Sequence, residues 1–282
     1  MAESKRTAGG LEGYDPSMFD KPSVTVDILV VTAGKRKKGG RADESGDGSG
    51  MKTASLRRRG SAKERVEPAL QLLLVKRDNE PFRDFWALPG GFVGMHDELE
   101  DAARRKLAEK ACVEGAYMEQ LYTFGGVERD PRMRIISVAY LALVPEGAVR
   151  FEPGNTVSDA ALFNVERREE GIVLSSAMGL EIKLESLAFD HGHIISVGLE
   201  RMRGKVDYTS IIFELLRSKS DFTLLELKRA YDCLKGEESN LSNFRKMIMK
   251  RYLDQGFMEE SGHTTKRNSV REAKCYRVRA KD

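Results

Sequence analysis

Runs of apolar residues predict the strands of a sheet in the first two thirds of the chain. β-Branched and aliphatic residues fill positions 24–31, 70–75 and 135–144, and a weaker run occupies 160–163. Polar or glycine-rich sequence bounds these runs, as is typical of buried strands. Apolar residues recur with helical spacing over 99–113. Strands interspersed with helices predict an α+β domain.

The pattern becomes helical near residue 187. Between there and residue 216 the chain contains three glycines and no proline, so we expect a continuous helical connection into a C-terminal module. Its first helix is predicted from a stripe of apolar residues spaced three and four apart. The residues of this stripe are Tyr208, Ile211, Ile212, Leu215 and Leu216.

Two further helices are predicted in this module. Thr223 and Glu226 have the spacing of a capping box, which predicts a helix start at this point. Ser239 or Asn240 can cap the third helix. The apolar residues expected to face inward from that helix are Phe244, Met247 and Ile248.

Two strands, at 256–262 and 273–279, follow the third helix and are joined by a basic segment. Three short helices followed by a hairpin predict a winged helix-turn-helix, whose third helix enters the DNA major groove. A helical protein-interaction domain would show the same apolar stripes.

Residues 34–66 are rich in Gly, Ser, Lys, Arg and Asp and contain little to bury, which predicts a long disordered loop. The basic runs in this insertion could contact nucleic acid, although a solvated loop is the simpler interpretation. We therefore divide the chain into an N-terminal segment (1–22), a sheet domain (23–204) and a C-terminal domain (205–282).

Charge separates the two domains. Residues 201–282 carry 19 Lys and Arg against 12 Asp and Glu, a balance of +7, whereas the whole chain has a formal charge of +3. A basic domain attached to an acidic one suggests contact with a polyanion, although an ordinary solvated surface would give the same count.

Composition also limits the cellular setting. No run of 18 apolar residues occurs, so we expect no membrane span, and the N-terminus lacks the apolar stretch of a secretory signal. The cysteines are odd in number and widely spaced, which argues against a disulfide framework or a cysteine-based zinc site and suits the cytoplasm. They are Cys112, Cys233 and Cys275.

The most specific motif begins with Trp-Ala-Leu-Pro-Gly-Gly-Phe-Val at 86–93 and continues into the predicted helix. It resembles the Nudix box, in which Gly, five residues, Glu and seven residues precede Arg-Glu-aliphatic-x-Glu-Glu-x-Gly-aliphatic. This resemblance implies the Nudix α/β/α sandwich. The residues in register with the box are Gly91, Asp97, Arg105, Leu107, Glu109 and Val113.

Departures from the box bear on catalysis. In Nudix hydrolases the glutamates of this helix hold a divalent metal ion, but here Lys106 and Lys110 replace two of them and leave Glu109 alone. Each ammonium group would repel Mg²⁺ by about 1–4 kcal/mol at 4 Å. We therefore expect no catalytic residue, no bound metal and no enzymatic activity. The alternative is a magnesium-dependent Nudix pyrophosphohydrolase, in which nearby carboxylates such as Asp97 substitute for the missing ones.

The chain as a whole resembles NrtR-type Nudix-related transcriptional regulators. The Arg-Lys-Leu-Ala-Glu-Lys helix is typical of these regulators rather than of active hydrolases. The resemblance spans residues 14–282 apart from the insertion. It is carried by residues 14–16, Phe19 and residues 21–27, 73–77, 105–110, 119–121, 129–132, 137–143 and 187–191.

This resemblance implies a repressor of NAD-metabolism or sugar-utilisation genes, without a required cofactor. Its Nudix domain would bind ADP-ribose or a related nucleotide or sugar, and its winged helix would bind double-stranded operator DNA, as a homodimer. The effector contacts carried over by position are Arg77, Trp86, Gly90, Gly91, Phe92, Arg105, Glu109, Arg129 and Asp130.

Some of these roles have structural alternatives. Arg77 and Arg129 suit bidentate binding of phosphate. Trp86 could stack on a base or simply pack beside the box, and Glu109 could bind ribose hydroxyls or stabilise the loop. Lys106 and Lys110 could contact a diphosphate or be exposed surface lysines.

Polar and basic residues of the third helix and of the wing are the expected DNA contacts. They are Asn240, Ser242, Asn243, Arg245, Lys246, Thr265, Lys266, Arg267 and Lys274. The family's usual Gly-Arg-Pro-Ala before the last strand is here Val-Arg-Glu-Ala at 270–273, which puts the wing's contacts in doubt. We expect His263 to be a surface residue rather than a metal ligand, because the sequence places no partner cluster around it.

Three hypotheses follow. The first is a ligand-responsive transcription factor, the second is a Nudix pyrophosphohydrolase, and the third is an RNA-processing Nudix protein that uses the basic insertion. The first two differ at Lys106 and Lys110, where an enzyme should carry carboxylates.

Overall fold

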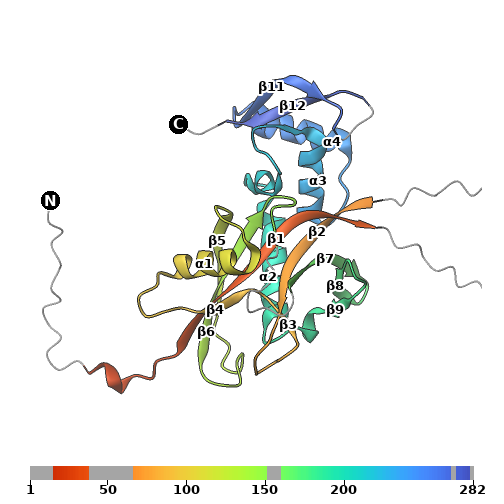
Figure 1. Ribbon diagram of the computed structural model, residues 1–282. Helices are drawn as coiled ribbons and strands as arrows, with labels where there is room; N and C mark the ends of the chain where they lie inside the picture. The colour runs from red at the N-terminus through yellow and green to blue at the C-terminus, as the bar shows by residue number, and fades with distance from the viewer. Residues whose placement is uncertain (1–14, 38–65, 151–159, 268–270, 280–282) are drawn as a thin grey trace, which may run out of the picture.

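A computed structural model describes residues 15–37, 66–150, 160–267 and 271–279. A large mixed sheet with helices on both faces forms the main domain, and a smaller helical domain with its own sheet lies at one end (Figure 1). The predicted α+β class, with a Nudix sandwich followed by a winged helix, is confirmed.

The larger sheet has nine strands in the described residues. Its main path runs β5-β6-β1-β2-β7-β8-β9, with β3 paired to β2 and β4 paired to β1. Strands β1 and β6 are parallel, and the other pairs are antiparallel. The strands are β1 (Ser23–Lys37), β2 (Val66–Lys76), β3 (Trp86–Ala87), β4 (Gly90–Phe92), β5 (Tyr117–Phe124), β6 (Ile135–Val144), β7 (Ala160–Arg168), β8 (Gly171–Ser176) and β9 (Glu181–Lys183).

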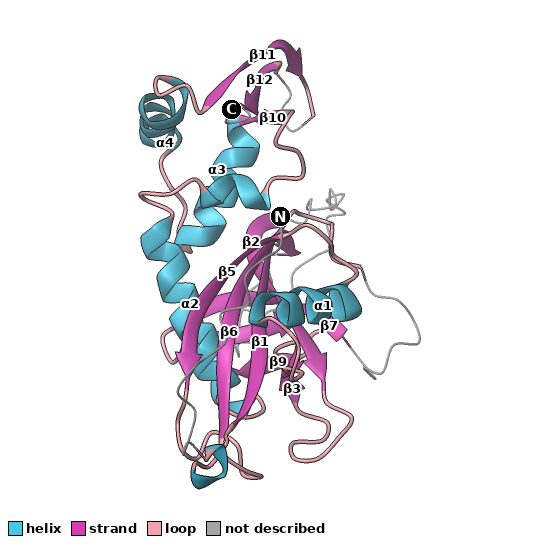
Figure 2. Cartoon of the chain, turned by 90° about the vertical axis from the view of Figure 1, so that its left-hand side faces the viewer, coloured by secondary structure: helices cyan, strands magenta, loops and turns pink. Residues whose placement is uncertain are grey.

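Helices cover both faces of this sheet, α1 on one and α2 on the other (Figures 1 and 2). Alternation along β1 produces the two layers, because successive side chains of a strand point to opposite faces. Val26, Ile28 and Val30 are buried with α1, whereas Leu29 and Val31 are buried with α2. The helices of this domain, with two short 3-10 turns, are η1 (Pro16–Met18), α1 (Leu99–Ala111), η2 (Leu184–Ser186) and α2 (His191–Lys205).

The smaller domain is a winged helix whose sheet has the order β10-β12-β11. Thr223 and Glu226 form the predicted capping box, and Asn240 caps α4 through two backbone N–H groups. Phe244 and Ile248 of α4 face the core as predicted. The elements are η3 (Ile211–Leu215), β10 (Phe222–Thr223), α3 (Leu224–Lys235), α4 (Leu241–Ile248), the π-helical turn η4 (Met249–Leu253), β11 (Met258–Thr265) and β12 (Ala273–Val278).

The predicted continuous helical connection, and the first helix starting at Tyr208, are wrong. Helix α2 ends at Lys205, only the 3-10 turn η3 follows, and the Tyr208 side chain is 71% exposed. The carbonyl oxygens that would accept backbone hydrogen bonds within such a helix instead accept hydrogen bonds from side chains later in the chain. Arg251 donates to the carbonyl oxygens of Val206 and Thr209, and the Tyr252 hydroxyl also donates to that of Thr209.

The predicted loop at 34–66 is too long at both ends. Strand β1 continues to Lys37 and β2 begins at Val66, with Lys35 paired to Pro68 in an antiparallel ladder. A ladder is held by backbone hydrogen bonds, so it can extend past the last apolar side chain. The rest of the insertion, 38–65, lies outside the described residues.

The two domains share one hydrophobic core. A single cluster of buried residues continues from the α2 face of the sheet, through Leu199 and Met202 of α2, to Phe213 and Leu227 of the winged helix. The predicted boundary at residue 204 therefore falls inside a packed helix. None of the helices in the described ranges combines the length and apolar character needed to cross a membrane.

Candidate functional site

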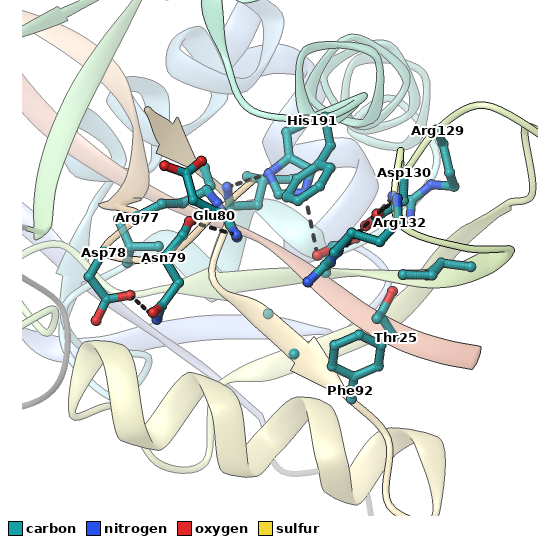
Figure 3. Close-up of a pocket in the computed structure, with 18 of the residues that line it drawn as sticks. Thr25, Arg77, Asp78, Asn79, Glu80, Phe92, Arg129, Asp130, Arg132 and His191 are labelled. Carbon is teal, nitrogen blue, oxygen red and sulfur yellow. Dashed lines mark hydrogen bonds and ion pairs between the residues drawn. The ribbon is translucent and has the colours of Figure 1, made fainter. Parts of the chain in front are cut away.

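A cavity of about 320 Å³ opens in the Nudix domain where four elements meet (Figure 3). They are β1, the glycine-rich turn at β4, the loop after β2 and the loop before β6; the residues preceding and beginning α2 close the cavity. Gly90 makes this packing possible: a Cβ at this position would lie 2.4 Å from the carbonyl oxygen of Val26 and 2.5 Å from Asp27 Oδ1. The Nudix glycines thus form one wall of the cavity.

A buried ion-pair network forms the floor of the cavity. Arg129 donates two hydrogen bonds to Asp190, at 2.7 and 2.9 Å, and one to Asp27 at 3.3 Å. The Ser137 hydroxyl donates to Asp27 at 2.5 Å. Burial opposes the charge of Arg129, but Asp190 and Asp27 outweigh it and hold the arginine's pKa above its usual value. This network links the cavity to the N-terminus of α2.

His191 is held in one orientation beside this network. Its Nδ1 accepts a hydrogen bond from the backbone N–H of Leu88 at 2.9 Å, so the proton of the neutral ring is on Nε2. That nitrogen lies 3.5 Å from Asp27 Oδ1. Complete burial lowers the pKa of His191 below its usual value, so the ring is neutral near pH 7.

Arginines and aromatic rings line the rest of the cavity. The Arg132 guanidinium lies 5.7 Å from the ring centroids of both Phe92 and Phe189, and that of Arg77 lies 4.7 Å from Phe189. Asp130 accepts two side-chain bonds from Arg132, which hold the aspartate's pKa below its usual value. Burial lowers the pKa of Arg77, and the positive charge of Arg132 adds to this effect. Cations beside flat rings suit a ligand that carries both phosphate and a base.

Six of the nine predicted effector contacts line this cavity, and three lie outside its lining. Trp86 packs edge-on against Phe163 in the core, with centroids 4.9 Å apart. Arg105 pairs with Asp97 at 2.7 Å. Glu109, which is exposed, pairs with Lys106 one turn earlier on α1. The six lining residues are Arg77, Gly90, Gly91, Phe92, Arg129 and Asp130.

Sequence reasoning missed several lining residues. Asp27, Phe189 and His191 belong to stretches that carry the family resemblance, at 21–27 and 187–191, so a signal was present without an assigned role. Arg132 likewise belongs to a stretch that carries the resemblance, at 129–132. Thr25 also lies in the stretch at 21–27, and its hydroxyl is buried at the cavity with no hydrogen-bond partner among the described residues.

The Nudix helix presents lysines where hydrolases carry carboxylates. Lys106 Nζ lies 2.7 Å from Glu109 Oε2, and its stem packs on the turn, since a Cβ at Gly91 would be 2.9 Å from Lys106 Cε. Lys110 lines the cavity. Burial, together with the charge of Lys106, lowers the pKa of Lys110. The helix therefore offers the cavity positive charge.

The predicted DNA-binding residues lie on α4 and the wing. Asn240, Ser242, Asn243, Arg245 and Lys246 are exposed, on the side of α4 opposite its buried residues. Arg245 of α4 lies close enough to Lys274 of β12 for its positive charge to act on that lysine. The wing residues Thr265, Lys266, Arg267 and Lys274 are exposed or half-buried.

Acidic neighbours neutralise part of the wing. Lys274 pairs with Glu260 at 2.8 Å, and Arg267 pairs with Asp221 at 3.0 Å. The expectation that no partner cluster surrounds His263 is wrong: its Nε2 lies 3.1 Å from Asp221, and Cys275 adjoins the pair. The sequence hides this group, because its members are more than ten residues apart and meet only through strand pairing.

Comparison with known proteins agrees with both halves of the structure. Residues 63–172 match the NUDIX domain model, and residues 212–278 match the NrtR DNA-binding winged helix domain model. The chain is also 32% identical over 215 residues to the ADPR responsive transcriptional repressor NtrR of Acinetobacter baylyi, covering 76% of this chain and 77% of that protein. The chain belongs to the NrtR family of Nudix-related transcriptional regulators.

Solved structures extend this similarity to the two-domain arrangement. A MutT/nudix family protein from Enterococcus faecalis has a TM-score of 0.65 at 27% identity, covering 93% of this chain and 88% of that one. Shewanella oneidensis NrtR complexed with a 27mer DNA has a TM-score of 0.60 at 26% identity, covering 91% and 93%. Because each match covers more than nine tenths of this chain, the similarity extends over both of its domains.

Proposed function

We propose that this regulator binds ADP-ribose, or a closely related nucleotide, in the Nudix cavity without hydrolysing it, and that the winged helix binds operator DNA. The observation that carries the proposal is the cavity's lining. Arg77 and Arg132 flank aromatic rings, and Lys110 extends from the helix that holds the catalytic metal in hydrolases. The A. baylyi relative, described as ADPR responsive, supports this choice of ligand.

The cavity's chemistry accounts for such a ligand part by part. A diphosphate needs cations, and both Arg132 and Lys110 line the cavity. Phe92 is half exposed beside the cavity and offers a flat face to a base or sugar. The Thr25 hydroxyl, which has no hydrogen-bond partner in the described part of the chain, can bond a ribose or phosphate oxygen. No metal ion is required for these contacts.

We expect purified protein to leave ADP-ribose intact in the presence of Mg²⁺ or Mn²⁺. Lys106 neutralises Glu109 and Lys110 places a second cation at the metal position, so the Lewis acid and the activated water are both lost. Chromatographic detection of AMP and ribose 5-phosphate is the measurement. Metal-dependent turnover that disappears in Glu109→Gln would instead support the hydrolase alternative.

Operator binding should depend on the exposed side of α4. Replacing both Arg245 and Lys246 by alanine is expected to weaken DNA binding by about tenfold or more, because contacts to bases and phosphates are worth about 1–3 kcal/mol each. The dependence of affinity on salt should also become shallower. Electrophoretic or anisotropy titrations at several salt concentrations measure both effects.

Lys183→Ala provides the matched control, because Lys183 is an exposed cation on β9 of the Nudix domain. The control should bind operator like the unaltered protein. Equal affinities of the double variant and the control would rule out α4 as the DNA-reading helix.

We further propose that the regulator is a homodimer on a palindromic operator, since two-fold symmetry in the site mirrors that of the protein.

A further inference from the structure

Three neighbouring strands of the winged-helix sheet bring a mixed set of side chains together. Asp221 directly precedes β10, His263 is on β11, and Cys275 is on the central strand β12. The metal-binding atoms of these three side chains all lie within 4.8 Å of one another, and no other group of three does so in the part of the chain that the structure describes.

A bulge in β11 creates this convergence. Glu260 pairs with Tyr276 and Thr264 pairs with Lys274, so the three residues 261–263 lie opposite Cys275 alone. Gly262 adopts a positive φ of 87°, which residues with a side chain rarely adopt. Bulges of this kind re-aim side chains and often adjoin functional sites. Here the bulge turns His263 toward Asp221 and Cys275.

The neighbouring residues already hold the potential ligands in place. Asp221 Oδ1 faces His263 Nε2 at 3.1 Å, while Oδ2 accepts a hydrogen bond from Arg267 at 3.0 Å. The other ring nitrogen of His263, Nδ1, is 3.0 Å from the Ser261 hydroxyl. Metal-bound histidines and carboxylates are usually fixed in this way through their second polar atoms. A metal ion could therefore bind Oδ1 and Nε2 without displacing Arg267 or Ser261.

We propose that Asp221, His263 and Cys275 form a binding site for zinc or a similar transition-metal ion in the wing. One oxygen, one nitrogen and one sulfur ligand suit such an ion rather than magnesium or calcium. The Cys275 thiol releases its proton to solvent on binding, so the thiolate and the Asp221 carboxylate balance the charge of a divalent ion. His263 is exposed, which leaves room for water as a fourth ligand.

Metal binding requires only a small decrease in the distances between the three ligand atoms. The ligand atoms of a tetrahedral zinc site lie about 3–4 Å apart, so the atoms here must approach by about 1 Å. The ion would connect the segment before β10 to both strands of the wing hairpin. It would thereby hold the wing hairpin in one position, and this hairpin carries Arg267, a predicted DNA contact. This proposal is independent of the effector assigned to the Nudix cavity.

The test uses the full-length protein after removal of metal with a chelator. Titration with Zn²⁺ against a chromophoric competitor should show one site per chain. Co²⁺, used as a spectroscopic probe, should give thiolate-to-metal charge-transfer absorption and the visible bands of a tetrahedral site. Absence of stoichiometric binding, or a cobalt spectrum without the thiolate band, would overturn the proposal.

Variants assign the ligands. His263→Ala should weaken Zn²⁺ binding at least tenfold, and Cys275→Ser should abolish the thiolate band. His96→Ala and Cys112→Ser are matched controls, because both residues lie in the Nudix domain, far from the wing in the fold. His263 is exposed, so its loss should leave the fold intact, as circular dichroism can verify. Unchanged Zn²⁺ affinity in folded His263→Ala would show that the ion binds elsewhere.

Discussion

Arg129→Ala is expected to lower the free energy of unfolding by about 3–5 kcal/mol, because it leaves buried Asp27 and half-buried Asp190 without their cation. The Arg129 side chain is only 5% exposed, and it holds Asp190 by two hydrogen bonds and Asp27 by one. Both carboxylates remain when the guanidinium is removed. Urea or thermal unfolding followed by circular dichroism measures the effect.

Arg132→Ala is the matched control for this prediction. Arg132 also pairs with a buried aspartate of the cavity, Asp130, but the Arg132 side chain is 37% exposed, and Asp130 keeps the hydrogen bond that it accepts from the backbone N–H of residue 132 at 3.0 Å. We expect a clearly smaller loss of stability for Arg132→Ala. Equal stability losses in the two variants would mean that the Arg129 network does not hold the domain together.

This expectation revises the role that the sequence suggested for Arg129. An arginine carried over by position from the family resemblance suits phosphate binding, yet the hydrogen bonds of Arg129 go to Asp190 and Asp27. Burial and pairing of this kind depend on residues 60 to 100 positions away, so no local pattern contains them. Arg132, three residues further along, lies over the aromatic rings and is the better candidate for ligand contact.

The fold was predictable wherever a local pattern determines the element. Strand β6 has the bounds of its apolar run at 135–144, and α3 begins at the capping box of Thr223 and Glu226. Prediction failed at residues 206–216, where helical spacing is present but tertiary hydrogen bonds compete. Arg251 and Tyr252 bind the carbonyls that a continuing helix would use.

The candidate site was predictable only where a contiguous motif forms it. The glycine-rich turn at 90–92 lines the cavity, whereas Trp86 of the same stretch packs into the core because strand alternation directs it away. The opposite wall comes from Phe189 and His191, about 100 residues later. Only the packing of α2 against the sheet brings these residues to the motif.

Effector and operator are expected to weaken each other's binding by the same factor, about 5–150-fold. The structure provides a physical connection in α2, which runs from the Nudix cavity toward the winged helix (Figure 2). Asp190 and His191 at its start adjoin the cavity. With 15 residues, the helix is about 22 Å long. A shift at the cavity can therefore be carried to the far end of the helix as a rigid-body motion.

The far end of α2 is bonded to the winged helix rather than continuous with it. Tyr231 and Lys235 of α3 bind Asp207 at 3.1 and 2.8 Å. The Tyr252 hydroxyl donates to the carbonyl oxygen of Thr209 at 2.6 Å. Lys205, the last residue of α2, also pairs with Glu119 of the sheet. Movement of α2 must therefore either carry the winged helix with it or break these bonds. If the winged helix moves with α2, the distance between the two α4 helices of a dimer changes.

Tyr252→Phe tests this connection without touching either ligand. Tyr252 is 4% exposed, so it cannot contact DNA directly, and removing its hydroxyl leaves Arg251 on the same carbonyl. We expect the coupling free energy between ADP-ribose and operator to fall by about 0.5–2 kcal/mol. Each separate affinity should change little. Tyr208→Phe, at an exposed tyrosine in the same segment, should leave the coupling intact.

The measurement is a titration of a labelled operator complex with ADP-ribose, repeated for each variant and paired with calorimetric binding of ADP-ribose to the DNA-free protein. If the two sites are coupled, the ADP-ribose concentration at the midpoint of the titration shifts with operator concentration, because each ligand weakens the binding of the other. ADP-ribose that binds tightly yet leaves operator affinity unchanged would end the sensor hypothesis for that ligand. Coupling that persists undiminished in Tyr252→Phe would instead exclude the Thr209 contact as part of the connection, since α2 would then act on the winged helix through Asp207 or the shared core alone.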